Sequence, residues 1–111
     1  MFKVYLQNAN TEQFGLRLEK TVFGVSHTLL YAEEFVSHDD ALSRCEEIRR
    51  HGADPAAYEL TTQDGRYGYQ LKAGGHVLAQ TPVVPTQQAA DEILAAAIAD
   101  IPSAQTEVSQ S

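Results

Sequence analysis

The chain has only one cysteine in its 111 residues, Cys45, so it cannot form an intramolecular disulfide bond. It also has no apolar run that approaches the roughly 20 residues a helix needs to span a bilayer. Residues 1–5 lack the basic and then long apolar pattern of a secretory signal. Together these absences predict a cytoplasmic protein that is not inserted in a membrane.

Basic side chains are few. Eight lysines and arginines stand against fifteen acidic residues, which gives a formal charge of −7. This surplus repels phosphate groups, so we expect neither nucleic acid nor an anionic membrane as a partner. The charge favours solubility. An acidic inhibitor that mimics nucleic acid stays open as an alternative, and it would need the carboxylates gathered on one side.

Motifs that carry known chemistry are missing as well. The sequence has no HExxH motif, no paired cysteines and no Gly-rich phosphate-binding loop. Its adjacent carboxylates, such as Glu46 and Glu47, point in different directions on a helix and face solvent. Cys45 lies on an apolar stripe between Ala41 and Ile48, which is typical of an inert core cysteine. We therefore expect no catalytic residues, no metal, no cofactor and no enzyme activity.

A short pattern occurs twice in the chain. Residues 13–20 (QFGLRLEK) align without a gap with residues 66–73 (RYGYQLKA). Each copy has an apolar strand before it, and an apolar run that begins at a histidine after it. A helix then follows, opened by Ser37 in the first copy and by Thr86 in the second. A repeat of this kind indicates two related structural units.

The periodicity within each copy predicts three strands and one helix. We expect strands near residues 2–7, 14–18 and 27–33 and a helix from Ser37 to Gly52, then strands near 58–60, 67–71 and 76–79 and a helix from Thr86 to Pro102. The predicted fold is α+β, with two tandem β-β-β-α repeats (1–53 and 54–102) that form one antiparallel sheet with both helices on one face. Residues 1–102 are then a single domain, and the polar residues 103–111 are expected to be a disordered tail.

The second copy, with Tyr58, the run Tyr67-Gly68-Tyr69-Gln70-Leu71, residues 75–79 and Ile93, resembles the YegP-like family of small bacterial proteins of unknown function. The match is to the tandem-repeat form of the family, with a divergent first copy. The resemblance implies two units packed about a pseudo-twofold axis into one sheet, and it implies no catalytic residues. The Asn-Gly-Glu turn of the family appears here as Gly74-Gly75-His76.

The first copy has a longer hairpin than the second. Nine positions separate Leu18 from His27, whereas five separate Leu71 from His76. The insertion contains Val22, Phe23 and Val25, and apolar residues at a loop tip reduce solubility unless something covers them. We predict that these three residues form a contact surface for a protein partner or for a second copy in a homodimer. Alternatively, residues 22–25 continue a strand and pack internally.

His27 and His76 occupy matching positions in the two copies, so a pseudo-twofold axis could bring them together. Two imidazoles are too few for a metal site, which normally needs three or four ligands. They would instead mark a ligand pocket between the repeats. The leading hypothesis is a non-catalytic module that acts by protein–protein contact or self-association, and the alternative is a small-ligand binder with this pocket.

Overall fold

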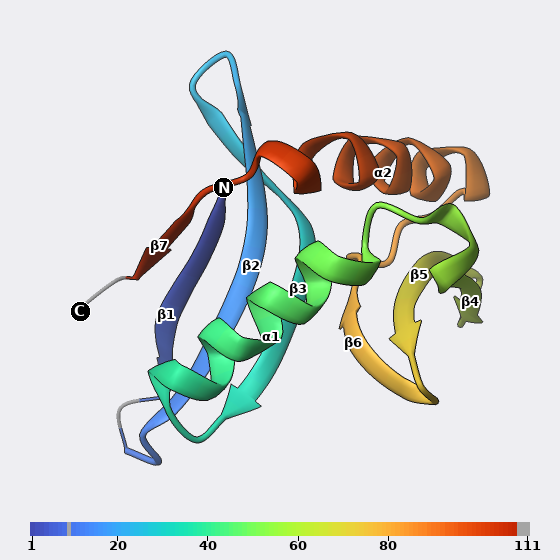
Figure 1. Ribbon diagram of the computed structural model, residues 1–111. Coiled ribbons are helices and arrows are strands. Elements are labelled where there is room, and N and C mark those ends of the chain that lie inside the picture. Colours follow the sequence, from blue (N-terminus) through green and yellow to red (C-terminus); the bar gives the residue numbers. More distant parts are fainter. Residues whose placement is uncertain (9, 109–111) are drawn as a thin grey trace.

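The structure is a computed structural model that describes residues 1–8 and 10–108 (Figure 1). Its elements in chain order are β1 (Phe2–Asn8), β2 (Gln13–Val22), β3 (Val25–Phe35), α1 (His38–His51), the short 3₁₀ helix η1 (Pro55–Ala57), β4 (Tyr58–Gln63), β5 (Arg66–Ala73), β6 (His76–Gln80), α2 (Gln87–Asp100), the 3₁₀ helix η2 (Ile101–Ser103) and β7 (Thr106–Val108). The described chain is therefore a mixed α+β fold with a seven-stranded sheet and two α-helices.

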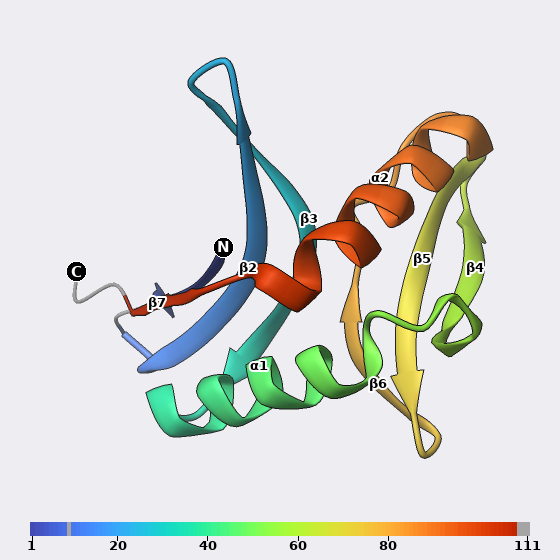
Figure 2. The same cartoon turned by 45° about the horizontal axis from the view of Figure 1, so that its top comes forward.

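The strands lie in the order β4-β5-β6-β3-β2-β1-β7. Neighbouring strands from β4 to β1 are antiparallel, as the sequence predicts, but β7 runs parallel to β1. In the middle of the sheet, β3 and β6 are joined at one residue pair, Tyr31 with Gln80. We call this point the β3–β6 junction. On either side of it, β1–β3 and β4–β6 diverge as two groups of strands (Figures 1 and 2).

The core is built from alternate positions of the strands and from one stripe of each helix. The strands alternate because successive side chains point to opposite faces of a sheet. The fully buried side chains are Phe2, Val4, Leu16, Leu18, Leu30, Ala41, Ile48, Leu71, Ala90, Ala97 and Ile101. Cys45 is 1% exposed, which confirms its predicted place in the core. Each large apolar side chain buried in this way contributes about 1.5–3 kcal/mol to folding.

Helices α1 and α2 connect the two groups of strands. Helix α1 contacts strands of both groups, including β2 and β6, and α2 contacts β3 and β5 (Figure 2). Beside the β3–β6 junction, Arg44 Nη1 of α1 donates to the Leu78 carbonyl at 3.0 Å and lies near the Val77 carbonyl at 3.4 Å. The helices thus hold together a sheet whose central ladder is only one residue pair long.

Both helices begin where the sequence predicts. The Ser37 hydroxyl accepts from the Asp40 amide at 3.1 Å, and the Thr86 hydroxyl accepts from the Ala89 amide at 3.1 Å. Gly52 ends α1, but its φ of −76° is not the left-handed conformation of a typical C-terminal glycine. The site instead lacks space, because a Cβ on Gly52 would lie 2.6 Å from the Ile101 Cδ1 atom.

The prediction of a disordered tail from residue 103 is wrong as far as residue 108. The Phe2 amide donates to the Gln105 carbonyl at 2.7 Å, and β7 then pairs with β1. Arg49 of α1 also donates to the Ala104 carbonyl and to the Thr106 hydroxyl. A polar segment can form this strand because backbone groups and one arginine supply its contacts. The predicted tail residues 109–111 lie outside the described chain.

Within the described part of the chain, neither helix is both long and apolar enough to cross a membrane.

Candidate functional site at the hairpin of β2 and β3

The hairpin of β2 and β3 extends beyond the rest of the sheet, at the top of Figure 1. Its last pairs are Lys20 with His27, Thr21 with Ser26 and Val22 with Val25. The pairing of β1 with β2 ends at Phe2 with Leu18, where Met1 also accepts from the Glu19 amide. The predicted lengthening is confirmed, because β2 and β3 have 10 and 11 residues whereas β5 and β6 have 8 and 5.

Two residues make the turn at the end of this hairpin, Phe23 with φ of +52° and Gly24 with φ of +79°. Positive φ at both positions is the geometry of a type I′ turn, which favours Asn-Gly or Asp-Gly. The β4–β5 hairpin has the expected pair, Asp64 and Gly65, with φ of +52° and +76°. Phenylalanine is an unusual choice, because the left-handed conformation costs an L-residue about 1–2 kcal/mol.

The Phe23 side chain is completely exposed, at 101% of its reference surface, and Val22 and Val25 beside it are 39% and 57% exposed. The alternative in which residues 22–25 pack internally is therefore wrong. Val22 and Val25 do continue the strands up to the turn, but they lie beyond the last residue pair of β1 and β2. The predicted contact residues form one exposed apolar tip, which we call the hairpin tip (Val22, Phe23 and Val25).

A pocket of about 440 Å³ lies between this hairpin and α2. We call it the α2 groove. Its strand wall comes from Lys20, Val22, His27, Thr28 and Leu29, and its other wall from Pro82, Ala89, Glu92, Ile93 and Ala96. The helix residues lie on one face of α2, because their spacing of three and four residues follows the helical repeat. One wall of the groove therefore comes from the β2–β3 hairpin, and the other comes from α2 and from Pro82 in the segment before it.

The structure places His27 in the α2 groove but does not bring His76 to it. Each histidine precedes its member of the Tyr31–Gln80 pair by four residues. Because β3 and β6 are antiparallel, the two histidines lie in opposite directions from that pair. At about 3.3 Å per residue their separation along the sheet is roughly 26 Å. The prediction of one pocket marked by both histidines is therefore wrong.

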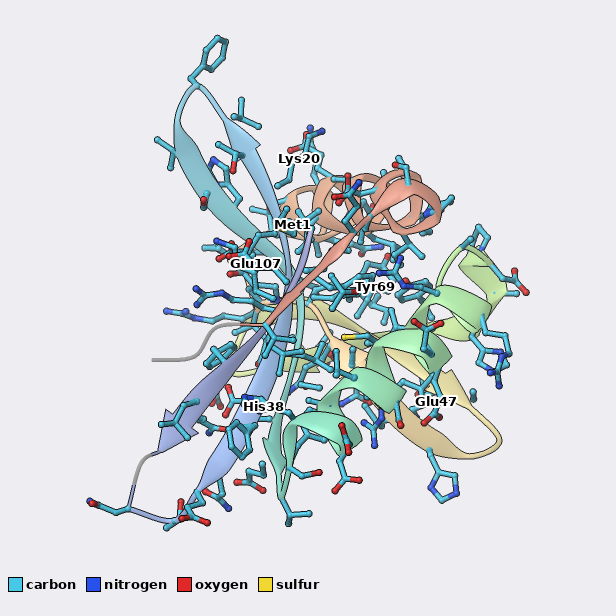
Figure 3. All side chains as sticks on the ribbon, turned by 60° about the vertical axis from the view of Figure 1, so that its left-hand side comes forward. Met1, Lys20, His38, Glu47, Tyr69 and Glu107 are labelled. Carbon is cyan, nitrogen blue, oxygen red and sulfur yellow. The ribbon has the colours of Figure 1, made fainter. Side chains whose placement is uncertain are left out.

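Three charged or titratable side chains at the groove have no hydrogen bond or ion pair within the described residues: Lys20, His27 and Glu92. Figure 3 shows Lys20 between the hairpin and α2. Two other lysines of the sheet are paired, in the Lys3–Glu19 contact at 3.0 Å and the Lys72–Glu59 contact at 2.7 Å. The groove therefore has an apolar floor and unpaired charges of both signs at its rim.

Sequence reasoning missed the helix wall of the groove. Ile93 of this wall is half-buried, and it packs against the core as well as lining the groove. The spacing of Ala89, Glu92, Ile93 and Ala96 along one helix face was present in the sequence. What that face meets depends on how the hairpin is placed relative to α2, and no local pattern contains this information.

No group of three His, Cys, Asp or Glu side chains suited to a metal ion occurs among residues 1–8 and 10–108. Cys45 is not placed for nucleophilic chemistry either. Burial raises the pKa of its thiol to about 11, and the nearby Arg49 only partly opposes this effect. A thiol with such a pKa holds little of the reactive thiolate near neutral pH.

We expect Cys45 to resist a thiol reagent in the folded protein at neutral pH and to react rapidly after unfolding in urea. Its pKa in the folded state lies above the ordinary value near 9. Its contribution to stability is therefore complete below pH 9 and is lost as the pH rises toward 11, where only the unfolded chain has lost the proton. Urea unfolding at pH 8 and pH 10, compared with Cys45→Ala, measures this contribution. Equal pH dependence in the two proteins would contradict it.

Comparison with known proteins supports the fold. No protein-family model matches the sequence, and no curated protein matches it. A solved structure of yegP from E. coli, a protein of unknown function, is 21% identical with a TM-score of 0.78, and the match covers 96% of this chain and 90% of that one. UPF0339 protein SO3888 from Shewanella oneidensis is 15% identical with a TM-score of 0.80 and the same coverage. The chain therefore has a YegP-like fold.

Proposed function

We propose that the chain is a non-catalytic module that binds another protein through the hairpin tip. The observation that carries this proposal is Phe23, a fully exposed phenylalanine in a backbone conformation that disfavours it. Residues in unfavourable backbone conformations gather at functional sites, because folding alone does not select them. Aromatic side chains, phenylalanine among them, are also enriched at the core of protein interfaces.

The architecture supports this use of the hairpin. The tip lies beyond the last β1–β2 pair, away from the rest of the sheet, and its three side chains are exposed. Its two strands keep regular pairing up to Val22 and Val25, which holds Phe23 in a defined place before any partner arrives. A preorganised aromatic anchor binds more tightly than one on a flexible loop, because less entropy is lost on binding.

Phe23→Asn tests the proposal. Asparagine tolerates positive φ, so we expect the free energy of unfolding to stay equal or to rise by about 1 kcal/mol. Affinity for a protein partner should fall at least about thirtyfold if Phe23 is an interface anchor. The partner is identified by capture from host lysate, and its affinity for the purified proteins is then measured by calorimetry.

Val77→Asn is the matched control, because Val77 is also an exposed apolar residue, at 43%, but it lies on β6 far from the hairpin tip. Its affinity for the partner should equal that of the wild-type protein. Equal affinity of the Phe23→Asn protein would contradict the proposal.

A small-ligand binder is the second candidate, and the α2 groove favours it. Its volume of about 440 Å³ lies in the range of small-molecule pockets, and His27 is one of its residues. A ligand that binds the folded state would raise the melting temperature in a metabolite screen. Lys20→Ala and His27→Ala should each remove that rise in melting temperature.

We further propose that the chain consists of two related β-β-β-α units, with both helices on one face of the sheet. The order of elements up to α2 and the aligned residues 13–20 and 66–73 support this arrangement. Gly15 and Gly68 occupy matching positions in the two units, and both are buried. The cytoplasm is the expected location.

A further inference from the structure

We propose that the occupant of the α2 groove is the hairpin tip of a second copy of this chain, in a twofold dimer in which each Phe23 enters the groove of the other copy. This inference rests on the proposed function, because it names the partner that the hairpin tip contacts.

The tip and the groove have matching chemistry. The groove floor is apolar, with Leu29 of β3 and Ile93 and Ala96 of α2. The tip presents Phe23 between two exposed valines. A volume of about 440 Å³ is large enough for a phenyl ring together with part of a flanking valine. Each surface thus supplies the apolar cover that the other lacks.

The hairpin tip and the α2 groove are adjacent on the molecule, which favours a second copy over an unrelated protein as the occupant of the groove. Val22 belongs to the tip and also lines the groove, so the two surfaces are adjacent. A twofold axis that lays two hairpins side by side in opposite directions brings both tips to both grooves at once. Such a contact is closed and self-complementary, as is usual for homodimers. An unrelated protein that binds the hairpin tip would leave the α2 groove uncovered.

The backbone of the hairpin supports the same arrangement. In the described chain, the pairing of β1 with β2 stops before Lys20, so the outer edge of residues 20–22 is open. Open strand edges readily pair with another strand. A second hairpin lying alongside would supply hydrogen-bond partners to this edge while its Phe23 reaches the groove.

The charges at the groove are complementary across such a dimer. Lys20 lies on β2, three residues before Phe23 of the turn, and would arrive with it, whereas Glu92 lies on the α2 wall that the tip would meet. Both side chains are unpaired within the described residues of one copy. The dimer therefore gives each a partner of opposite charge, in two symmetric pairs.

Sedimentation equilibrium of the full chain, from micromolar to millimolar concentration, is the first experiment. We expect a reversible dimer for the wild-type protein, and at least about thirtyfold weaker association for Phe23→Asn. Val77→Asn should associate as the wild-type protein does. Lys20→Glu and Glu92→Lys should each weaken association, and the double variant should recover it, because the charge pair is restored with reversed sign. All of these positions are exposed, so the variants are expected to fold.

Mixed disulfide formation then locates the contact. In a Cys45→Ala background, a protein with Phe23→Cys is mixed with one carrying Ala89→Cys, and the cross-linked heterodimer is measured under mild oxidation. It should form faster than the heterodimer of Phe23→Cys with Gln63→Cys, an exposed position at the end of β4. Disulfides form only where the two Cα atoms come within about 7 Å.

A chain that stays monomeric at all concentrations overturns this inference, as does a dimer that Phe23→Asn does not weaken. If the chain is monomeric but Phe23→Asn abolishes binding to a different purified protein, the proposed function stands and the second copy is the wrong occupant. If Phe23→Asn changes neither association nor partner binding, both proposals fall. A small molecule that shifts the melting temperature of a monomeric chain would instead assign the groove to a ligand.

Discussion

Phe2→Ala should lower the free energy of unfolding by about 3–5 kcal/mol, the usual loss for a buried aromatic residue. Phe2 has no exposed surface, and it pairs with the equally buried Leu18 across β1 and β2. The Arg49 guanidinium lies 4.8 Å from the centre of its ring. The substitution therefore removes a large apolar surface and opens a cavity beneath a charged group. For a domain of this size, the loss is a large part of the total stability.

The chain provides its own control for this measurement. Phe23→Ala removes the same side chain from a fully exposed position, where no buried contact is lost. Urea unfolding of both variants compares the two sites directly. If Phe2→Ala cost no more than Phe23→Ala, the packing of β1 against α1 would have to be revised. Protection of the amides of β7 should fall together with stability in the Phe2→Ala protein, because Phe2 donates to Gln105.

Gly52→Val should destabilise the protein by about 3 kcal/mol, at the upper end of the range for overpacked sites. A Cβ atom there would lie 2.6 Å from both the Ile101 Cδ1 atom and the Ile48 carbonyl oxygen. The Tyr58 hydroxyl also donates to the Gly52 carbonyl at 2.8 Å, which limits any backbone shift. Ile101 has no exposed surface, so it has little room to move away.

Gly52→Asn separates this explanation from helix capping. Asparagine is accepted at left-handed C-terminal positions, so a capping role would leave stability nearly unchanged. Lack of space predicts a large loss for Asn as well as for Val. Ala53→Val, at the exposed neighbouring position, should stay within about 0.5 kcal/mol of the wild-type protein. Thermal unfolding of the three variants tests these expectations together.

Much of the fold follows from local patterns in the sequence. Alternation places Leu16 and Leu18 in the core, and the Ser37 and Thr86 caps mark the starts of both helices, because these features depend on neighbouring residues. The long β2–β3 hairpin is also predictable, since four extra residues between Leu18 and His27 have no counterpart in the second copy.

Features that depend on contacts between distant residues were not predictable in this way. Strand β7 forms because the open edge of β1 and Arg49 supply partners for a polar segment that has no strand pattern of its own. His27 and His76 align in the sequence, but antiparallel pairing at the β3–β6 junction sends them in opposite directions. The α2 groove likewise exists only once the hairpin and α2 are placed side by side.

The β3–β6 junction has a mechanical consequence. A sheet normally resists bending because each strand is bonded to its neighbours along its length, whereas here a single residue pair joins the two halves. Force applied to the β2–β3 hairpin should therefore reach β4–β6 mainly through the packed helices. The hydrogen bond from Arg44 to the Leu78 carbonyl is one contact that links α1 to β6. We therefore expect α1 and α2, rather than the sheet itself, to limit bending between the two groups of strands.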